Sequence, residues 1–513
     1  MSRAAGLLLA IGASACGAPR PHSRPPNVLF IAVDDLRPAL GVYGDRFVKT
    51  PNIDRLARSG VTFLQAHAQQ AVCNPSRASL MTGLRPDSLR VWDLETDFRS
   101  TVPDVVTLPQ HFMNHGYHAV SIGKIYHNLI PDSLSWSEPE IHVPGFPYDP
   151  DAVYHHRDNL AIQEARKAAI IEAGDQAKHI DRYGLWYLKA NATESVDLPD
   201  SVYYDGAQTN MAVRKLGELA AKNQPFFFGV GYYRPHLPFN APQKYWDLYQ
   251  RDSIPLATNR FVPKDGPEMA IDNMRELRGY ADFPEVPHPF KGGVSEADAR
   301  RLKHGYYASV SYIDAQIGRL LDQLDSLGLA QNTIVVLWGD HGYKLGEHNS
   351  WAKMTNYQID THAPLIIRAP GTIPPNLQLS QMVEFVDIYP TLTELAGLPL
   401  PRHLQGVSAL PLVKNPARPW KPAIFSQFLR SGIWVAPDGI PYMGYSMRTD
   451  RYHYVTWVNW DTKAVAATEL YDLLADPDEN ANLAGKPESA PTLTELETRR
   501  RAGWRAALPP NPA

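Results

Sequence analysis

The feature that most limits how this chain can fold is a set of apolar runs, at residues 27–33, 117–122, 225–232 and 333–338. The first reads NVLFIAV, and its near-continuous apolar character is typical of a strand buried on both faces. Segments with helical spacing separate the runs. Strands that alternate with helices predict an α/β fold, in which a large mixed, mostly parallel sheet is flanked by helices.

Each of these runs is followed within a few residues by side chains that can bind a metal or an anion. In open α/β sheets the site lies beyond the carboxyl ends of the strands, so we expect these side chains to lie together. Adjacent carboxylates there repel each other unless a cation lies between them, which favours a hard divalent ion over a solvated turn. The residues are Asp34 and Asp35 after the first run, Lys124 and His127 after the second, His236 after the third, and Asp340 and His341 after the fourth.

A second constraint comes from residues 73–83, CNPSRASLMTG. Pro75 suits the first turn of a helix and Gly83 suits its left-handed end, so Cys73 should begin a short helix. The backbone N–H groups and the dipole there favour an anion, and Arg77, one turn later, adds donors suited to a tetrahedral oxyanion. The alternative is a buried cysteine beside a turn, since a lone cysteine commonly behaves as a small hydrophobe.

Some of these residues have further features of a site. His236 has prolines nearby on both sides, which stiffen its backbone as a positioned acid or base requires. Asp340 is a better metal ligand than the histidine after it, because a site made of oxygen atoms suits a carboxylate. Lys353 follows the fourth run on the rim of the expected site, with a solvated lysine as the alternative. A surface role is likewise the alternative for Lys124 and His127.

The pattern of alternating strands and helices ends between residues 399 and 422. Beyond this point, short β-type segments with turns between them predict an antiparallel sheet, and 492–508 predicts a closing helix. We therefore expect a catalytic domain at 27–400 and a smaller C-terminal subdomain at 401–513. Residues 128–200 have weak periodicity, which predicts loops. The expected C-terminal strands are 423–428, 443–449, 452–458 and 469–473.

The N-terminus has the pattern of an exported precursor. Residues 1–15 combine a basic start, an apolar run too short to span a bilayer and small residues, as a secretory signal does. The segment ASAC that ends at Cys16 is similar to a bacterial lipobox, which predicts cleavage before Cys16, its lipidation and a linker at 16–26. The alternative is ordinary cleavage near Ala15 or Ala18. The expected location is the periplasm or outer membrane of a bacterium, with membrane contact only through the lipid.

Composition gives no indication of a nucleic-acid partner. The 50 Lys and Arg residues against 54 Asp and Glu residues give a net charge of −4. The chain has only two cysteines, Cys16 and Cys73. Because both have a predicted chemical role, we expect no structural disulfide.

The segment CNPSR at 73–77, followed by Thr82 and Gly83, resembles the signature of type I sulfatases, although Met81 stands where leucine is more common. The resemblance extends from about residue 27 to about residue 483. It implies an alkaline-phosphatase-like fold and a sulfuric ester hydrolase acting on a sulfated sugar or polysaccharide fragment. Within the family, the segments most similar to iduronate-2-sulfatases are 34–38, 234–236 and 443–449.

The resemblance also implies the cofactors. In this family the cysteine, here Cys73, is oxidised to formylglycine by a formylglycine-generating or anaerobic maturation enzyme. The hydrate of that aldehyde attacks sulfur beside Arg77. A calcium ion stabilises the charge on a sulfate oxygen. Its implied ligands are Asp34, Asp35, residue 73, Asp340 and His341.

The remaining site residues are implied to handle the sulfuryl group. Lys124, Lys353 and His236 surround it. One of them protonates the departing alcohol; His236 is the first candidate and Lys353 the second. His127 then takes the proton from the remaining hydroxyl, and the aldehyde is restored as sulfate leaves.

Two other interpretations stay open on the sequence. The first is a phosphate or phosphonate monoester hydrolase of the same superfamily, because some phosphonate hydrolases also use formylglycine. The second is a lipoprotein that binds sulfated glycans without turnover. The sulfated sugar, the choice of exo or endo action and the oligomeric state do not follow from the sequence.

Overall fold

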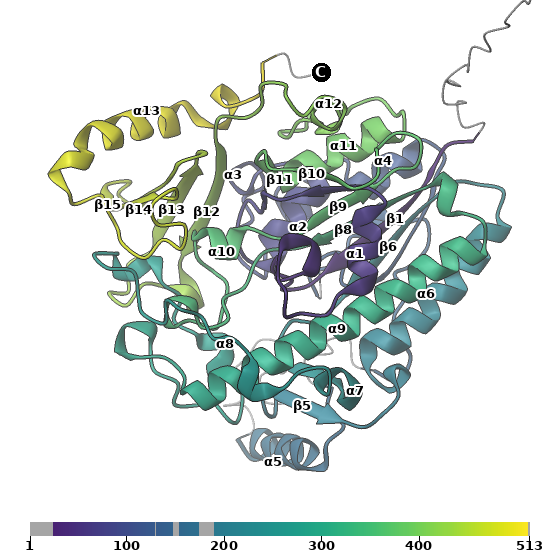
Figure 1. Ribbon diagram of the computed structural model, residues 1–513, viewed down its shortest axis with the longest axis horizontal. Coiled ribbons are helices and arrows are strands. Elements are labelled where there is room, and N and C mark those ends of the chain that lie inside the picture. Colours follow the sequence, from purple (N-terminus) through teal and green to yellow (C-terminus); the bar gives the residue numbers. More distant parts are fainter. Residues whose placement is uncertain (1–23, 129, 147–152, 174–188, 511–513) are drawn as a thin grey trace, which may run out of the picture.

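The computed structural model describes residues 24–128, 130–146, 153–173 and 189–510. At its centre lies a seven-stranded sheet with the order β10-β2-β9-β8-β1-β6-β4 (Figure 1). Within the described sheet, β9 runs antiparallel to β2 and β8, and the other neighbours are parallel. The predicted mixed, mostly parallel sheet is therefore confirmed. The strands are β1 Asn27–Val33, β2 Val61–Phe63, β4 His118–Gly123, β6 Phe226–Tyr232, β8 Thr333–Gly339, β9 Leu365–Arg368 and β10 Leu377–Leu379.

Helices cover both faces of this sheet, and β1 shows why its sequence is apolar throughout. Alternate residues of a strand point to opposite faces. Leu29, Ile31 and Val33 lie in one core, with side chains of α1 Pro51–Arg58, α6 Tyr204–Ala221 and α9 Glu296–Ser326. Val28, Phe30 and Ala32 lie in the other core, with side chains of α2 Cys73–Thr82, α4 Leu108–Asn114 and α11 Ile388–Leu395.

The long helix α9 follows its sequence signals and reaches the predicted site. The Ser295 hydroxyl accepts a hydrogen bond from the Asp298 N–H and so caps the helix. The apolar side of α9 packs in the core and the helix lies beside α6 (Figure 1). The Tyr306 hydroxyl donates to the Asp35 carbonyl over 2.8 Å. Helix α9 therefore supports the turn that follows β1.

A four-stranded antiparallel sheet forms the C-terminal part, as predicted. One face packs against α13 Ala490–Ala506 through Leu496, and the other packs against Tyr357 and Ile271. The Gln427 N–H donates to the Gln69 carbonyl over 2.8 Å, so the first strand lies beside the segment that enters α2. The strands are β12 Ile424–Arg430, β13 Tyr442–Arg448, β14 Tyr452–Asn459 and β15 Val465–Asp472.

The boundary at residue 400 remains an interpretation. Helix α12 Leu410–Lys414 lies beyond that boundary, but its side chains belong to the core of the large sheet. The antiparallel sheet begins only at β12. The intervening segment therefore packs with the catalytic part.

Residues 128–200 differ from the loops that the sequence predicted. They include α5 Arg157–Ala173 and β5 Thr193–Val196, which pairs with β7 Phe239–Pro242. Most of the described side chains of α5 are exposed, and Asn159 is buried. Because the described side chains of α5 form no buried apolar stripe, its sequence lacks the periodicity that reveals a helix.

The predicted signal peptide at 1–15 and the predicted lipidation site Cys16 lie outside the described residues. Within the described residues, no helix is both long and apolar enough to cross a membrane.

Candidate active site

The carboxyl ends of four neighbouring strands bring the predicted residues together. Strands β8, β1, β6 and β4 are adjacent in that order. Backbone hydrogen bonds continue past the strands, from the Asp340 N–H to the Val33 carbonyl and from the Asp34 N–H to the Tyr232 carbonyl. Asp34, Asp35 and Asp340 have no exposed surface. The sequence prediction that these side chains share one edge of the sheet is confirmed.

Gly231 explains how Lys124 comes so close to this cluster. A Cβ atom at position 231 would lie 2.1 Å from the Lys124 carbonyl oxygen. The Lys124 N–H donates to the Gly231 carbonyl over 2.9 Å. A larger residue at position 231 would push the end of β4 away from β6. Gly231 is therefore needed for the close approach of the two backbones.

Cys73 begins helix α2, and Gly83 ends it in a left-handed conformation, as predicted. The Cys73 Sγ lies 3.5 Å from His341 Nε2 and 4.0 Å from Lys124 Nζ. Burial and the nearby Asp34 carboxylate raise the pKa of the Cys73 thiol well above its ordinary value. Because the thiolate is the nucleophilic form, an unmodified Cys73 is poorly suited to attack a substrate.

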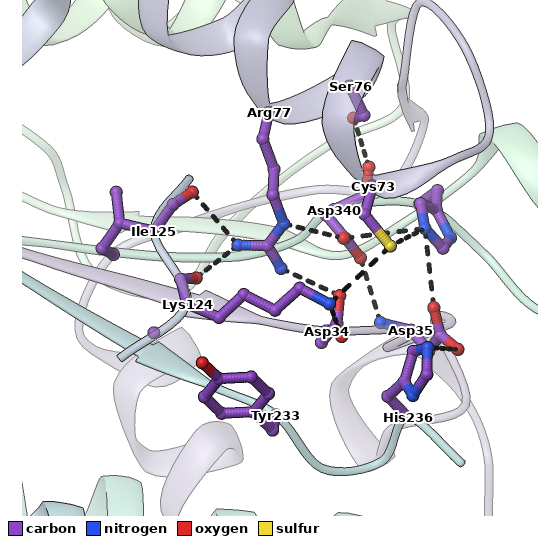
Figure 2. Close-up of polar contacts among 12 residues, drawn as sticks. Asp34, Asp35, Cys73, Ser76, Arg77, Lys124, Ile125, Tyr233, His236 and Asp340 are labelled. Carbon is purple, nitrogen blue, oxygen red and sulfur yellow. Dashed lines mark hydrogen bonds and ion pairs between the residues drawn. The ribbon is translucent and has the colours of Figure 1, made fainter. Parts of the chain in front are cut away.

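Arg77 lies between two carboxylates of the cluster (Figure 2). Its Nε donates to Asp340 and an Nη to Asp34, each over 3.0 Å, and the other Nη donates to the carbonyls of Lys124 and Ile125. The sequence predicted that this guanidinium would offer donors to an oxyanion. In the structure Arg77 is completely buried, and its donors hold two carboxylates in place.

Lys124 completes the charge balance around Asp34. Its Nζ donates to Asp34 over 2.6 Å and lies 5.7 Å from the centre of the Tyr233 ring (Figure 2). Burial alone would raise the pKa of Asp34, but Lys124 and Arg77 outweigh it and hold that pKa well below its ordinary value. Asp34 is therefore a carboxylate at neutral pH.

Lys353 has the same relation to Asp35. Its Nζ donates to both carboxylate oxygens of Asp35, over 2.9 and 2.7 Å, and lies 3.2 Å from Glu276 Oε2. Burial would lower the pKa of Lys353, but Asp35 and Glu276 raise it well above its ordinary value. Lys353 is a buried site lysine and not a solvated one.

His236 is held between acceptors. Its Nδ1 lies 2.6 Å from the Leu237 carbonyl oxygen, and its Nε2 lies 2.9 Å from Glu276 Oε1 and 3.9 Å from Asp35. Because a carbonyl and a carboxylate can only accept, both ring nitrogens carry a hydrogen in this arrangement. Sequence reasoning missed Glu276, which lies in the short helix α8 Arg275–Arg278 within a stretch that has no motif or periodicity.

His127 lies at the edge of the cluster. Its Nδ1 is buried and has no hydrogen-bond partner among the described residues. Burial and the positive charge of Lys124 lower the pKa of His127 well below its ordinary value. The ring is therefore neutral and can accept a proton.

The donor set fits one hard divalent cation. One group of candidate ligands is Asp34, Cys73 and Asp340, and another is Asp35, Cys73 and His341. Within each group the ligand atoms lie within 4.8 Å of one another. Calcium binds oxygen atoms at about 2.3–2.6 Å, so ligands on opposite sides of one ion are about this far apart. His341 Nδ1 donates to the Gly342 carbonyl over 2.9 Å, which leaves Nε2 as a possible ligand.

The charged side chains of the cluster balance one another. Four carboxylates meet four cationic groups, when His236 is counted with a hydrogen on both ring nitrogens. The case for a bound cation therefore rests on the positions of the ligand atoms. The carboxylates are Asp34, Asp35, Glu276 and Asp340, and the cations are Arg77, Lys124, Lys353 and His236.

The chain is similar to known proteins over most of its length. The chain matches the family model described as Sulfatase over residues 26–398, and the model described as N-sulphoglucosamine sulphohydrolase, C-terminal, over residues 346–502. It is 33% identical to the iduronate 2-sulfatase of Mus musculus, over 92% of this chain and 93% of the relative. It is 34% identical to the iduronate 2-sulfatase of Homo sapiens, over 89% of this chain and 90% of the relative.

Solved structures share the fold. A protein in complex with its substrate D-glucosamine-2-N,6-O-disulfate has a TM-score of 0.71 at 23% identity, covering 94% of this chain and 98% of that one. A phosphonate monoester hydrolase of Agrobacterium radiobacter has a TM-score of 0.69 at 24% identity, covering 94% and 96%. The predicted fold and the predicted similarity to iduronate-2-sulfatases are confirmed. The chain therefore belongs to the sulfatase family of sulfuric ester hydrolases.

Proposed function

We propose that this sulfatase removes a sulfate ester from a saccharide, using a formylglycine made from Cys73 and a calcium ion. The observation that carries the proposal is the position of Cys73, at the start of α2 and within 3.5 Å of His341 and 4.0 Å of Lys124. A thiol with a raised pKa serves poorly there. Oxidation to an aldehyde would give this position a reactive group that needs no thiolate.

The names of the similar proteins support a saccharide substrate. The mouse and human relatives are iduronate 2-sulfatases, and the fold neighbour was solved with a disulfated glucosamine. We therefore propose a sulfated sugar unit as the substrate, with a 2-sulfated uronate as the first compound to test.

The cofactors would supply the groups that the side chains lack. A formylglycine at position 73 would supply, as its hydrate, two hydroxyls on one carbon: a nucleophile for sulfur and a second group through which sulfate could be released. The three aspartates, residue 73 and His341 would hold a calcium ion, which would supply positive charge to stabilise the sulfate group.

The side chains of this chain bind the ester and move protons. Lys124 and Lys353 extend from two sides of the aspartate cluster, where their charges neutralise the sulfuryl oxygens. His236 carries a hydrogen on Nε2 at the edge of the site and can donate it to the departing alcohol oxygen. His127, which is neutral, accepts a proton on its buried Nδ1.

Parallel assays with matched esters test the proposal. We expect kcat/KM to be higher for a sulfate ester than for the phosphate or phosphonate ester of the same alcohol, and a 2-sulfated uronate to be turned over. A higher kcat/KM for the phosphonate ester would assign the protein to phosphonate hydrolysis, as in its neighbour from Agrobacterium.

The general acid can be identified from the leaving group. A sugar hydroxyl is a poor leaving group and needs protonation, whereas an activated aryl alcohol departs almost unaided. General acid catalysis contributes about 10²–10⁴-fold. We expect His236→Ala to lose a factor in that range on a sulfated sugar and far less on an aryl sulfate, measured as kcat on both substrates.

Lys353→Ala is the matched comparison, because Lys353 contacts Glu276 as His236 does but also holds Asp35. It should reduce turnover of both substrates by similar factors. Equal losses for His236→Ala on the two substrates would assign that histidine to binding. A selective loss on the sugar in Lys353→Ala would assign the acid role to the lysine.

A further inference from the structure

We propose that Glu276 is a positioning residue that holds the general acid His236 in its working position, with Lys353 as the counter-charge that keeps Glu276 in place. The inference rests on the proposed function, because it gives His236 and Lys353 the roles described above. It adds Glu276, which no sequence motif indicated. This residue lies in the short helix α8 and does not follow one of the strands that carry the other site residues.

The contacts of Glu276 place it between the two residues. Its Oε1 lies 2.9 Å from His236 Nε2, and its Oε2 lies 3.2 Å from Lys353 Nζ. The Glu276 side chain is only 11% exposed. One carboxylate thus bridges two cationic donors that come from distant parts of the chain.

A carboxylate is the group that this position needs. His236 Nε2 faces one carboxylate oxygen, and the Lys353 ammonium forms an ion pair with the other, so the position needs two oxygens that share a negative charge. Glutamine has one accepting oxygen and one donating amide nitrogen, so it can satisfy only one of the two neighbours. Burial would raise the pKa of Glu276, but Lys353 and His236 hold it well below its ordinary value, so the residue is ionised.

The turn that carries Glu276 is itself fixed. Met274 has a left-handed backbone conformation, and its N–H donates to Asp272 over 2.5 Å. Leu277 is buried in the core that contains α9. An Nη of Arg278 donates to the Val286 carbonyl over 3.1 Å. Glu276 therefore extends from an anchored support, as a residue that positions others requires.

The arrangement prepares His236 for its task. The Leu237 carbonyl and Glu276 fix the two ring nitrogens, so the plane of the imidazole is set before a substrate arrives. When the ester oxygen approaches Nε2, the N–H exchanges one acceptor for another. Lys353 keeps Glu276 in place during that exchange.

The test is a double-mutant cycle of Glu276→Gln and His236→Ala, with kcat and KM measured on a sulfated sugar and on an aryl sulfate. We expect Glu276→Gln to lower kcat on the sugar by about 10–100-fold, the range seen when a supporting hydrogen-bond partner is removed. The loss on the aryl sulfate should be smaller, and KM should change less than kcat. In the His236→Ala background the same change should cost less than about 3-fold, since residues that act through each other are not additive.

Two further variants separate positioning from folding. Glu276→Asp keeps both accepting oxygens and should recover part of the loss. Glu285→Gln changes an exposed carboxylate further along the same segment and should behave as wild type. Aryl sulfate turnover and a thermal melt report whether each variant is folded.

The results of these assays separate a failure of the positioning role from a failure of the proposed function. Additive losses in the cycle, or equal losses of Glu276→Gln on both substrates, would overturn the positioning role. If His236→Ala loses activity selectively on the sugar while Glu276→Gln equals wild type, the inference fails and the proposed function stands. If the wild-type protein turns over no sulfate ester, both fail.

Discussion

Cys73→Ala and Cys73→Ser are expected to abolish sulfatase turnover while the protein stays folded. Removing the nucleophile of an enzyme lowers kcat by several orders of magnitude, on the order of 10⁴–10⁶-fold. Serine is the informative variant, because it keeps a hydroxyl near His341 and Lys124 but cannot become an aldehyde. With a single hydroxyl it could be sulfated once but has no second hydroxyl to release the sulfate. Steady-state assays on a sulfated sugar and on an aryl sulfate give the measurement.

Met81→Leu is the matched control for this prediction. Met81 is buried in the same short helix, and a change between methionine and leucine conserves volume. This variant should keep near-wild-type kcat. Near-wild-type turnover by a folded Cys73→Ser protein would refute the formylglycine mechanism.

The second large effect is expected at the metal ligands. Asp34→Asn and Asp340→Asn should lower calcium affinity by at least about 100-fold, more than the loss of a residue that merely supports a ligand. Asp34→Asn also removes a charge partner of both Arg77 and Lys124, which leaves two buried cations less compensated. Breaking a buried ion pair costs about 3–5 kcal/mol, so this variant should also melt at a lower temperature. Two measurements report on calcium: its content after dialysis, and its affinity from a titration below the melting temperature. We expect both to fall together with activity.

Asp314→Asn is the control for the metal experiment. Asp314 is a buried carboxylate on α9 that accepts from the N–H groups of Asn52 and Ile53 at the start of α1. Its replacement should leave calcium content unchanged. Stoichiometric zinc in the active enzyme, or full calcium occupancy in both Asp34→Asn and Asp340→Asn, would contradict the proposed single calcium site.

The positions of the site residues could be predicted because local sequence determines them. The apolar run of β1 requires burial on both faces, and Asp34 and Asp35 directly follow its end. Pro75 and Gly83 set the limits of α2 around Cys73. Signals of this kind act over a few residues, so one sequence is enough to interpret them.

What the sequence did not predict depends on tertiary contacts. The donors of Arg77 point at Asp34 and Asp340, which directly follow two different strands, and nothing near Arg77 in sequence indicates these partners. Glu276 lies 40 residues from His236 in a stretch without periodicity, so its contact exists only in the folded chain. Helix α5 was missed because its surface is mostly exposed. The signal peptide and the lipidation of Cys16 stay predictions.

The most direct test of the account is the mass of the tryptic peptide that spans residues 59–77, from protein made in a host with a formylglycine-generating enzyme. The account predicts that, in an active preparation, this peptide carries an aldehyde in place of the Cys73 thiol, and that the aldehyde fraction rises and falls with sulfatase activity between preparations. A fully active preparation in which the peptide carries only unmodified cysteine would contradict it.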